Sequence, residues 1–310
     1  MRCLVTGATG HIGPPLVRLL ASGGHEIALL LRPDSDSARI ADALPGSVRI
    51  PWDLADPRSA APRIEAFRPE AVAHLAWGGV TNSLRDDPQQ LLLNLRGSLE
   101  LLEVAHAAGA RTWVGLGSQA EYGLHEGVMR EDLPERPVTL YGVSKHCTRQ
   151  ASEGLCRVLG LRFVWLRLFA AYGPWDDPVK LIPSTIATLL RGERPALSRG
   201  EQRWDYLFVE DAAEAILAVL AGERARGVYN LASGEAPTVR SIAERIRDLI
   251  DPRLPLGLGE LPYRADQVMR LEGDTARLRR DTGWRPRVGL EEGLSRTIAW
   301  MRARATAGEG

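Results

Sequence analysis

Short apolar runs alternate with longer helical runs along the first half of the chain. The apolar runs, each of strand length, lie at residues 2–6, 25–31, 48–52, 71–75, 112–116 and 162–168. Helical stretches are predicted between them at residues 16–20, 58–67 and 89–108, and a further helix is predicted to begin at Tyr141. Strands that alternate with helices in this way predict an α/β fold with a parallel sheet. Ligands of such sheets bind at the carboxyl ends of the strands.

The pattern changes after residue 168, where proline-containing loops become frequent. The helices predicted in this half lie near residues 183–191 and at residues 238–250 and 290–303. Residues 304–310 are predicted to form a frayed tail. The change in pattern and the length of the chain together predict about two domains.

The composition is that of an ordinary globular protein of 310 residues, with 45% hydrophobic and 25% charged residues. Lys plus Arg equals Asp plus Glu at 39 each, and the charges form no long run of one sign. This balance argues against a protein that binds nucleic acid or an anionic membrane. The N-terminus has no signal-peptide pattern, and no run of about 18 apolar residues occurs, so a cytoplasmic location is expected.

No metal site is expected from the cysteines or histidines. Cys3, Cys147 and Cys156 have neither metal-binding nor redox spacing, so free thiols are the expected state. The six histidines form no HExxH motif and no cluster with the cysteines.

A glycine-spaced turn follows the first predicted strand directly. It has the sequence TGATGHIG (residues 6–13) and leads into an apolar helical run. Gly7, Gly10 and Gly13 allow the tight turn, the close backbone approach and the close helix packing that a pyrophosphate at a helix N-terminus needs. No Gly-Lys-Ser/Thr follows, so the turn is not a P-loop. The N-terminal segment is therefore predicted to bind a dinucleotide.

The end of the second predicted strand indicates which dinucleotide binds. An acid there would bind the ribose 2′-hydroxyl of NAD, but the chain has Leu31 followed by Arg32. A guanidinium suits a 2′-phosphate, so NADP(H) is the predicted cofactor and NAD is the alternative. The competing interpretation is a solvated arginine at a strand end, because Asp34 and Asp36 lie nearby.

Tyr141 and Lys145 form the candidate catalytic pair. A proline-containing loop at residues 133–137 precedes them and helix-forming residues follow, so the two side chains are predicted one turn apart on one helix face. An ammonium beside a phenol lowers the pKa of the phenol from about 10 toward neutrality, which suits protonation of an alkoxide. For an isolated Tyr and Lys at this spacing, the alternative is a plain pair on a helix surface. Ser118 follows the strand that precedes this helix.

Together these motifs resemble those of the extended short-chain dehydrogenase/reductase family, specifically its sugar-nucleotide branch of epimerases, dehydratases and ketoreductases. The resemblance covers almost the whole chain, and the shared order and spacing of its motifs argue against coincidence. The motifs are TGATGHIG (6–13), Asp53-Leu54, HLAW (74–77), NLRGSLELLEVA (94–105), Ser118, YGVSK (141–145), RLFAAYGP (167–174), RWDYLFVEDAA (203–213), YNLASGE (229–235) and GWRPRVGLEEGL (283–294).

The resemblance implies a Rossmann-like doubly wound parallel sheet with a smaller C-terminal substrate-binding domain. The NADP-binding domain would comprise residues 1–168, and residues of about 206–235 would return to it. The substrate-binding domain would comprise residues 169–205 and 236–303. The resemblance also implies a homodimer.

The resemblance further implies roles for individual residues. Tyr141 would donate or accept the proton, Lys145 would hold the nicotinamide ribose and tune Tyr141, and Ser118 would hydrogen-bond the reacting oxygen. The residues implied in cofactor binding are Gly7, Thr9, Gly10, His11, Ile12, Gly13, Arg32, Asp53, Leu54, Leu75, Ala76, Asn94, Tyr141 and Lys145, of which Asp53 and Leu54 would contact the adenine. The residues implied in substrate binding are Trp77, Ser118, Lys180, Arg203 and Arg264, of which the two arginines would grip the diphosphate. For Asn94 and Arg264 the alternative is an ordinary polar residue without a ligand.

Two departures from the family pattern bear on the activity. Dehydratases of the family carry Thr-Asp-Glu before a Tyr-Gly step, whereas this chain has Ser118-Gln119-Ala120 at the start of that run. The acid and base of water elimination are therefore missing, and the Cys and His of isomerising epimerase-reductases have no counterpart either. Ala170 also replaces the asparagine that usually contacts the substrate diphosphate.

The predicted activity is the NADPH-dependent reduction of a nucleoside-diphosphate-4-keto-6-deoxy-sugar, with a proton from Tyr141. The stretch LPYRADQVMRLEGD (261–274) resembles 4-ketoreductases of deoxysugar pathways. The alternative is an NAD-dependent nucleotide-sugar 4-epimerase, which uses the same Ser, Tyr and Lys. A non-catalytic cofactor sensor on this fold would carry a damaged Tyr-Lys pair, whereas the pair is intact here.

Overall fold

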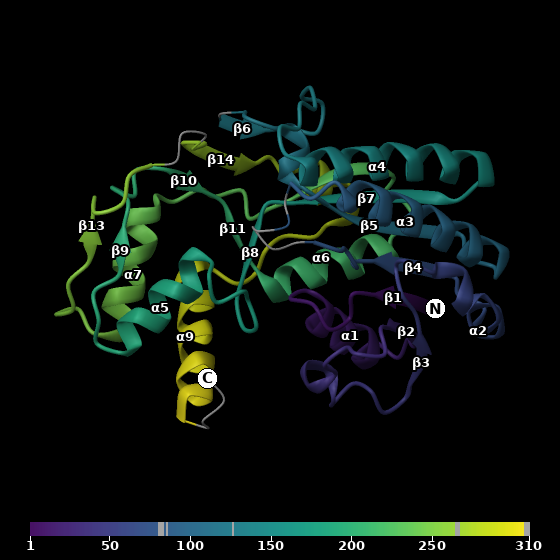
Figure 1. The fold of residues 1–310 in the computed structure, drawn as a ribbon, viewed down its shortest axis with the longest axis horizontal. Coiled ribbons are helices and arrows are strands. Elements are labelled where there is room, and N and C mark those ends of the chain that lie inside the picture. The colour runs from purple at the N-terminus through teal and green to yellow at the C-terminus, as the bar shows by residue number, and fades with distance from the viewer. Residues whose placement is uncertain (80–83, 85, 126, 264–266, 307–310) are drawn as a thin grey trace.

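A parallel sheet of seven strands forms the centre of the protein, which a computed structural model describes over residues 1–79, 84, 86–125, 127–263 and 267–306 (Figure 1). The strand order across the sheet is β12 (Gly227–Leu231), β7 (Arg162–Leu168), β5 (Thr112–Ser118), β4 (Ala71–His74), β1 (Arg2–Thr6), β2 (Glu26–Leu31) and β3 (Ser47–Pro51). The first strand, β1, lies inside the sheet, and later strands are added on both sides of it. The predicted Rossmann-like doubly wound sheet is therefore confirmed.

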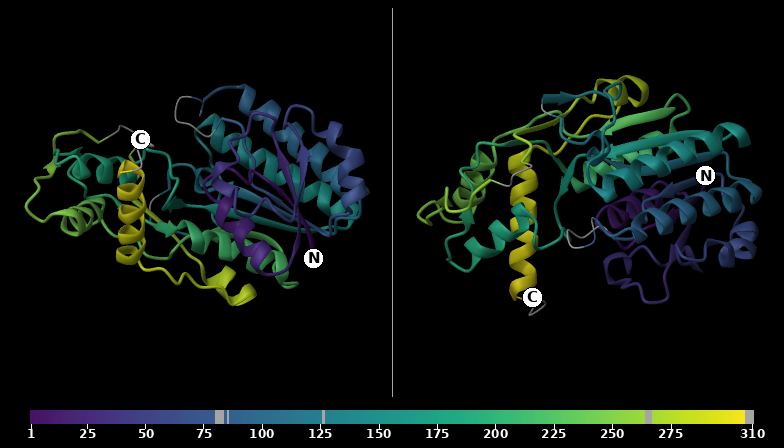
Figure 2. Two further views of the ribbon diagram at one scale, coloured as in Figure 1. Left: turned by 90° about the horizontal axis from the view of Figure 1, so that it is seen from below. Right: turned by 45° about the horizontal axis from the view of Figure 1, so that its top comes forward.

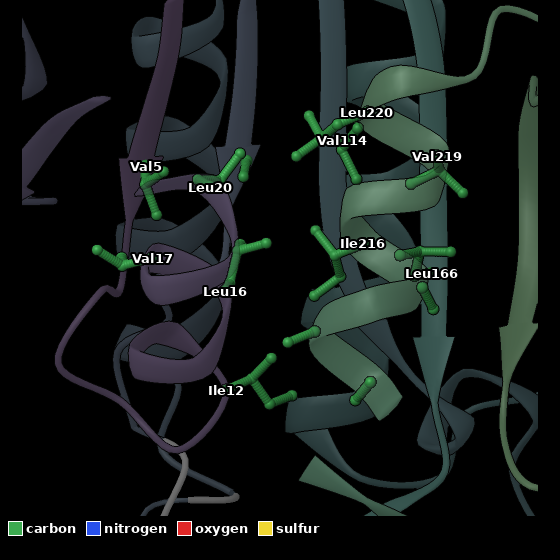
Figure 3. Packing of buried hydrophobic residues seen from close by; sticks show 14 of the residues in the cluster. Val5, Ile12, Leu16, Val17, Leu20, Val114, Leu166, Ile216, Val219 and Leu220 are labelled. Atoms are coloured by element: carbon green, nitrogen blue, oxygen red, sulfur yellow. The ribbon is translucent and has the colours of Figure 1, made fainter. Parts of the chain in front are cut away.

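Helices cover both faces of this sheet because its strands are apolar on both sides. The elements on one face are α1 (Gly13–Ser22) and α6 (Val209–Ala221), and those on the other are η2 (Pro57–Ala60), α2 (Ala61–Phe67), α3 (Gln89–Ala107) and α4 (Leu140–Leu159). On the first face, Leu16 and Leu20 of α1 lie beside Ile216 of α6, and Val114 and Leu166 of the sheet face this helix layer (Figure 3). Helix α6 belongs to the segment that was predicted to return to the first domain.

A smaller lobe lies on the side of the molecule opposite the N-terminus (Figures 1 and 2). Its elements are α5 (Leu181–Leu190), α7 (Val239–Ile250), α9 (Leu290–Thr306), β9 (Ala196–Leu197) and β13 (Gly257–Leu258). It has its own core, in which Ile186, Ile242 and Ile298 from the three helices are buried together. Helix α9 continues to Thr306, so residues 304–306 of the predicted tail are helical.

Short strands between the two lobes were not predicted from the sequence. They are β6 (Gly127–Met129), β10 (Arg203–Trp204) and β14 (Arg270–Gly273), which form one sheet, and β8 (Ala170–Tyr172) and β11 (Tyr206–Phe208), which pair with each other. Segments this short show no periodic pattern. The remaining elements are η1 (Ala38–Ile40), η4 (Gln119–Tyr122) and α8 (Ala276–Thr282). Leu278 of α8 and the following Trp284 lie in the core on the α1 face of the central sheet, although the sequence placed them in the second domain.

Candidate active site

A cavity of about 940 Å³ opens at the carboxyl ends of the central strands. The glycine turn, the ends of β2, β4 and β5, the start of α4 and residues of the smaller lobe all line it. Every predicted cofactor-binding residue except Asn94 lines this cavity, and so do Trp77, Ser118 and Lys180. The fold thus brings the predicted dinucleotide site and the predicted catalytic residues into one space.

The glycine turn packs tightly against the end of β4. Gly7 has a φ of +70°, and a Cβ there would lie 2.7 Å from the backbone nitrogen of Ala76, so a larger residue would be both strained and blocked. A side chain at Gly13 would overlap the carbonyl of Gly7. Thr6 fastens the same contact, because its Oγ1 accepts hydrogen bonds from the N–H groups of Leu75 at 3.1 Å and Ala76 at 3.0 Å. The N-terminus of α1 therefore faces the cavity, and this arrangement fits a pyrophosphate.

Asn94 hydrogen-bonds a segment of the cavity wall without lining the cavity. Its side chain is fully buried, its Oδ1 accepts from the N–H of Gly78 at 2.8 Å, and its Nδ2 donates to the carbonyl of Gly78 at 3.1 Å and to that of Gln90 at 2.7 Å. These bonds fix the segment after β4 that carries Ala76 and Trp77. Asn94 itself does not line the cavity.

Helix α4 begins at Leu140, one residue before the predicted start, and places Tyr141 and Lys145 in its first two turns. Thr139 caps the helix, since its Oγ1 accepts from the N–H of Gly142 at 3.1 Å. The Lys145 Nζ donates to the carbonyl of Leu116 on β5 at 2.6 Å and lies 5.9 Å from the centre of the Tyr141 ring. The predicted pair thus lies beside the strand that ends at Ser118.

Trp77 encloses this pair. The Lys145 ammonium lies 3.6 Å from the centre of the Trp77 ring, and the indole meets the Tyr141 ring edge-on at 6.3 Å between centroids. The Trp77 Nε1 donates to Gln90 Oε1 at 3.2 Å, which fixes the orientation of the ring. Burial lowers the pKa of Lys145 to about 7, against the opposing effect of the negative charge on Glu121. The structure thus gives Trp77 a contact with the candidate catalytic pair.

Ser118 is held in a capping box at the start of η4. Its Oγ accepts from the N–H of Ala120 at 3.1 Å, and the Glu121 Oε1 accepts from the N–H of Ser118 at 2.9 Å. Glu121 was not predicted from the sequence as a site residue. The pattern Ser-x-x-Glu at residues 118–121 could have identified it.

Arg32 lines the cavity next to Leu31, where the sequence predicts the 2′-phosphate contact. Its Nε lies 3.3 Å from Asp34 Oδ1, and both side chains are mostly exposed. An exposed pair of this kind is weak, so a phosphate can displace the carboxylate. Ser35, which was not predicted as a site residue, also lines the cavity beside Arg32.

Arg203 does not reach the cavity, contrary to the position implied for it. Gln202 and Trp204 line the cavity instead, because neighbouring residues of an extended segment face opposite sides. The Arg203 side chain is exposed and donates to the carbonyl of Ala236 at 3.2 Å. Arg264 lies outside the described residues.

Lys180 approaches the cavity from the start of α5. Its Nζ donates to Asp176 Oδ1 at 2.7 Å, and the Nδ1 of His11 in the glycine turn lies 3.4 Å from the same oxygen. Burial lowers the pKa of His11 to about 4, so the imidazole is neutral at pH 7. Among the described residues that line the cavity, the basic side chains besides His11 are Arg32, Lys145 and Lys180.

Two structural features are absent from the residues that the structure describes. These residues contain no group of three or more His, Cys, Asp or Glu side chains that could hold a metal ion. They also contain no helix that is long and apolar enough to cross a membrane.

Known proteins resemble this chain along nearly all of its length. Two curated relatives are a dTDP-glucose 4,6-dehydratase from Streptomyces griseus (31% identical, 96% of this chain and 93% of the relative) and a GDP-6-deoxy-D-mannose reductase from Pseudomonas aeruginosa (28% identical, 98% of each). Two similar solved structures are a UDP-glucose 4-epimerase from Thermus thermophilus in complex with NAD (28% identical, TM-score 0.84, 97% of this chain and 99% of that chain) and RMD from Pseudomonas aeruginosa complexed with NADPH (26% identical, TM-score 0.83, 98% and 99%).

The family assignment rests on a match over most of the chain. Residues 3–232, which include the glycine turn, Ser118 and the Tyr141–Lys145 pair, match the NAD dependent epimerase/dehydratase family. Solved structures similar to this chain hold NAD or NADPH, and the residues around the cavity fit such a dinucleotide. The chain therefore belongs to the NAD dependent epimerase/dehydratase family, within the extended short-chain dehydrogenases/reductases, and is an NAD(P)-dependent enzyme.

Proposed function

We propose that the protein is an NADPH-dependent ketoreductase that acts on a nucleoside-diphosphate-4-keto-6-deoxy-sugar. One observation carries this choice of reaction: Gln119 and Ala120, not carboxylates, line the cavity beside Ser118. Among the described residues, the acids that line the cavity are Asp53, at the end of β3, and Asp176, which is paired with Lys180. Proton transfer to a carbonyl oxygen is therefore available at Ser118 and Tyr141, whereas acid–base elimination of water is not.

The residues around Ser118 can complete a carbonyl reduction. A bound reduced nicotinamide would supply the hydride to the carbonyl carbon. Tyr141 Oη donates its proton to the carbonyl oxygen, Ser118 Oγ hydrogen-bonds that oxygen, and the Lys145 ammonium stabilises the phenolate that Tyr141 becomes. The products are the alcohol and the oxidised cofactor, and the phenolate regains its proton from solvent.

The relatives support a nucleotide sugar as the substrate. Both curated relatives named above carry a nucleoside-diphosphate sugar in their names, and one of them is a reductase. The cavity also extends beyond Ser118 to the short strands between the lobes, where Trp204 and Tyr206 line it, and to Lys180 at the start of α5. An ammonium at this end suits the diphosphate of such a substrate.

The reaction can be tested directly. The purified protein is incubated with NADPH and a 4-keto-6-deoxy sugar nucleotide, and the loss of the reduced nicotinamide's absorbance is followed together with the product mass. We expect one NADPH to be consumed for each product molecule, which gains two hydrogens. Isomerised product without net NADPH consumption, together with tightly held NAD, would instead establish the 4-epimerase.

Lys180→Ala should raise the KM for the sugar nucleotide about tenfold and leave kcat nearly unchanged. A phosphate contact far from the reacting carbon mainly contributes uniform binding, and a hydrogen bond to a charged group contributes about 1.5–3 kcal/mol. Steady-state kinetics at saturating NADPH measure both constants.

The matched control for this prediction is Arg203→Ala, which removes a nearby cation that the structure places outside the cavity. Its KM should equal that of the wild type. A larger rise in KM for Arg203→Ala than for Lys180→Ala would restore Arg203 as the diphosphate ligand.

A further inference from the structure

A buried carboxylate lies directly beneath the catalytic residues. Glu121 in η4 is 0% exposed, and its Oε1 accepts hydrogen bonds from the N–H of Ser118 and from the Trp165 indole, both at 2.9 Å. Its Oε2 accepts from the Nε of Arg167 on β7, also at 2.9 Å. A carboxylate that is buried away from water needs several hydrogen-bond donors to replace its hydration. Glu121 does not line the cavity, so any effect on the reaction must pass through its neighbours.

Glu121 belongs to a buried ionic cluster, which we define as Glu121, Glu135, Arg149 and Arg167. Arg167 is 0% exposed and pairs with both glutamates. Arg149 of α4 donates to Glu135 Oε2 at 3.0 Å, and its Nε lies 3.9 Å from Glu121 Oε2. The cluster thus contains two negative and two positive charges, and only Glu121 contacts Ser118 among these four residues.

The strand next to the catalytic residues is shaped to admit this carboxylate. A side chain at Gly117 would overlap the Glu121 carboxylate and the Trp165 indole. Gly117 stands between Leu116, whose carbonyl receives the Lys145 ammonium, and Ser118, whose N–H donates to Glu121. Glu121 is therefore packed against the short stretch of β5 that carries Ser118 and receives the Lys145 ammonium.

Few charged or titratable groups surround the Lys145 ammonium. Its ammonium lies over the Trp77 ring, next to Tyr141 of its own helix, and makes one hydrogen bond to a backbone carbonyl. His74 of β4 also faces it, but burial, together with the charge on Lys145, lowers the pKa of this histidine to about 3, so it is neutral. Glu121 is the negative charge that opposes the effect of burial on the pKa of Lys145.

We infer that Glu121 is a positioning residue of this active site, which keeps Lys145 in its ammonium form and fixes the Ser118 hydroxyl. The inference rests on the roles proposed above for Ser118, Tyr141 and Lys145. Its physical basis is a carboxylate held out of solvent by three hydrogen-bond donors, where attraction for an ammonium is screened less than at the surface. Without that charge, Lys145 loses its proton at lower pH and stabilises the Tyr141 phenolate less.

The lysine content of the chain allows a direct test, because Lys145 and Lys180 are its only two lysines. Protein labelled with an NMR isotope at the lysine ε-carbons is titrated with pH, and the Lys180→Arg variant assigns the two signals. We expect Lys145 of the wild type to titrate near pH 7. In Glu121→Gln the midpoint should fall by about one pH unit or more.

Glu135→Gln is the matched control, because it removes a carboxylate from the same ionic cluster without touching Ser118. Lys145 should titrate in this variant as it does in the wild type. An unchanged midpoint in Glu121→Gln, or an equal shift in Glu135→Gln, would overturn the inference.

A second variant covers the case in which Glu121→Gln does not fold. Glu121→Gln combined with Arg149→Gln keeps the Arg167–Glu135 pair and the charge balance of the cluster. The Lys145 midpoint should again fall, relative to Arg149→Gln alone. No difference between these two proteins also counts against the inference.

Kinetics separate the two effects of Glu121. In Glu121→Gln the alkaline limb of kcat/KM should move to lower pH with Lys145, because activity requires the ammonium. Glu121→Asp keeps the charge but is one methylene shorter, so kcat should fall roughly tenfold or more through Ser118 while the Lys145 midpoint stays. If Glu121→Asp has the kcat of the wild type, the inference that Glu121 fixes the Ser118 hydroxyl is wrong. The NMR titration needs no substrate, so failure of the proposed reaction leaves its result interpretable.

Discussion

Tyr141→Phe should lower turnover by a factor on the order of 10²–10⁴, while NADPH affinity stays nearly unchanged. The variant removes the proton that the developing alkoxide needs, and it keeps the ring that meets Trp77 edge-on. Because Lys145 remains in place beside the ring, the cavity wall should keep its shape. Single-turnover kinetics with the 4-keto sugar nucleotide, together with equilibrium binding of NADPH, measure the two quantities separately.

Tyr122→Phe is the control for this experiment. The Tyr122 hydroxyl is buried and donates to Asn230 Oδ1 at 2.6 Å, so its loss should reduce the free energy of unfolding by about 1–3 kcal/mol and leave turnover intact. Activity of Tyr141→Phe within tenfold of the wild type would show that another group donates the proton.

Changing Leu31 to Asp and Arg32 to Asn together should reverse the cofactor preference from NADPH to NADH. A charge-assisted contact between Arg32 and the 2′-phosphate contributes about 1.5–3 kcal/mol, or roughly one to two powers of ten in affinity. The structure supports the pair as the site of discrimination, because Leu31 and Arg32 both line the cavity and Leu31 offers no acceptor to a free 2′-hydroxyl. Dissociation constants for NADPH and NADH in both proteins test this.

Asp34→Asn serves as the control for the cofactor experiment. It removes the exposed carboxylate that pairs with Arg32, so NADPH should bind at least as tightly as it does to the wild type. If the wild-type protein prefers NADH, or is purified with tightly held NAD, the assignment to NADPH and to a reductase both fail and the epimerase takes their place.

Local patterns in the sequence were sufficient to locate the glycine turn and the candidate catalytic pair. The glycine turn, the end of the second strand at Leu31 and Arg32, and the start of the helix at Tyr141 each depend on a few adjacent residues. Their structure follows from backbone geometry and helix capping, which act over one or two turns. Parallel strands place their carboxyl ends at one edge, and this rule brought Ser118 and the glycine turn to one cavity.

The residues that line the substrate side of the cavity could be identified only from the tertiary structure. Arg203 and Trp204 are adjacent in the sequence, and a shift of one residue decides which of them faces the cavity. The short strands β6, β10 and β14 set that register, and they carry too few residues for a periodic pattern. Short segments also carry too little pattern to show that Leu278 and Trp284 pack in the core of the central sheet.

The ionic cluster beneath Ser118 also depended on the tertiary structure. Glu121, Glu135, Arg149 and Arg167 come from separate elements, and their sequence positions do not distinguish them from solvated charges. Only the packing of α4 and η4 against β7 brings them together, with Glu121, Arg149 and Arg167 buried and Glu135 partly exposed. The sequence by itself therefore determined the fold, the dinucleotide turn and the Tyr141–Lys145 pair, because short-range geometry specifies them. The tertiary structure decided the substrate wall and the charges behind the active site, because these depend on contacts between residues that are distant along the chain.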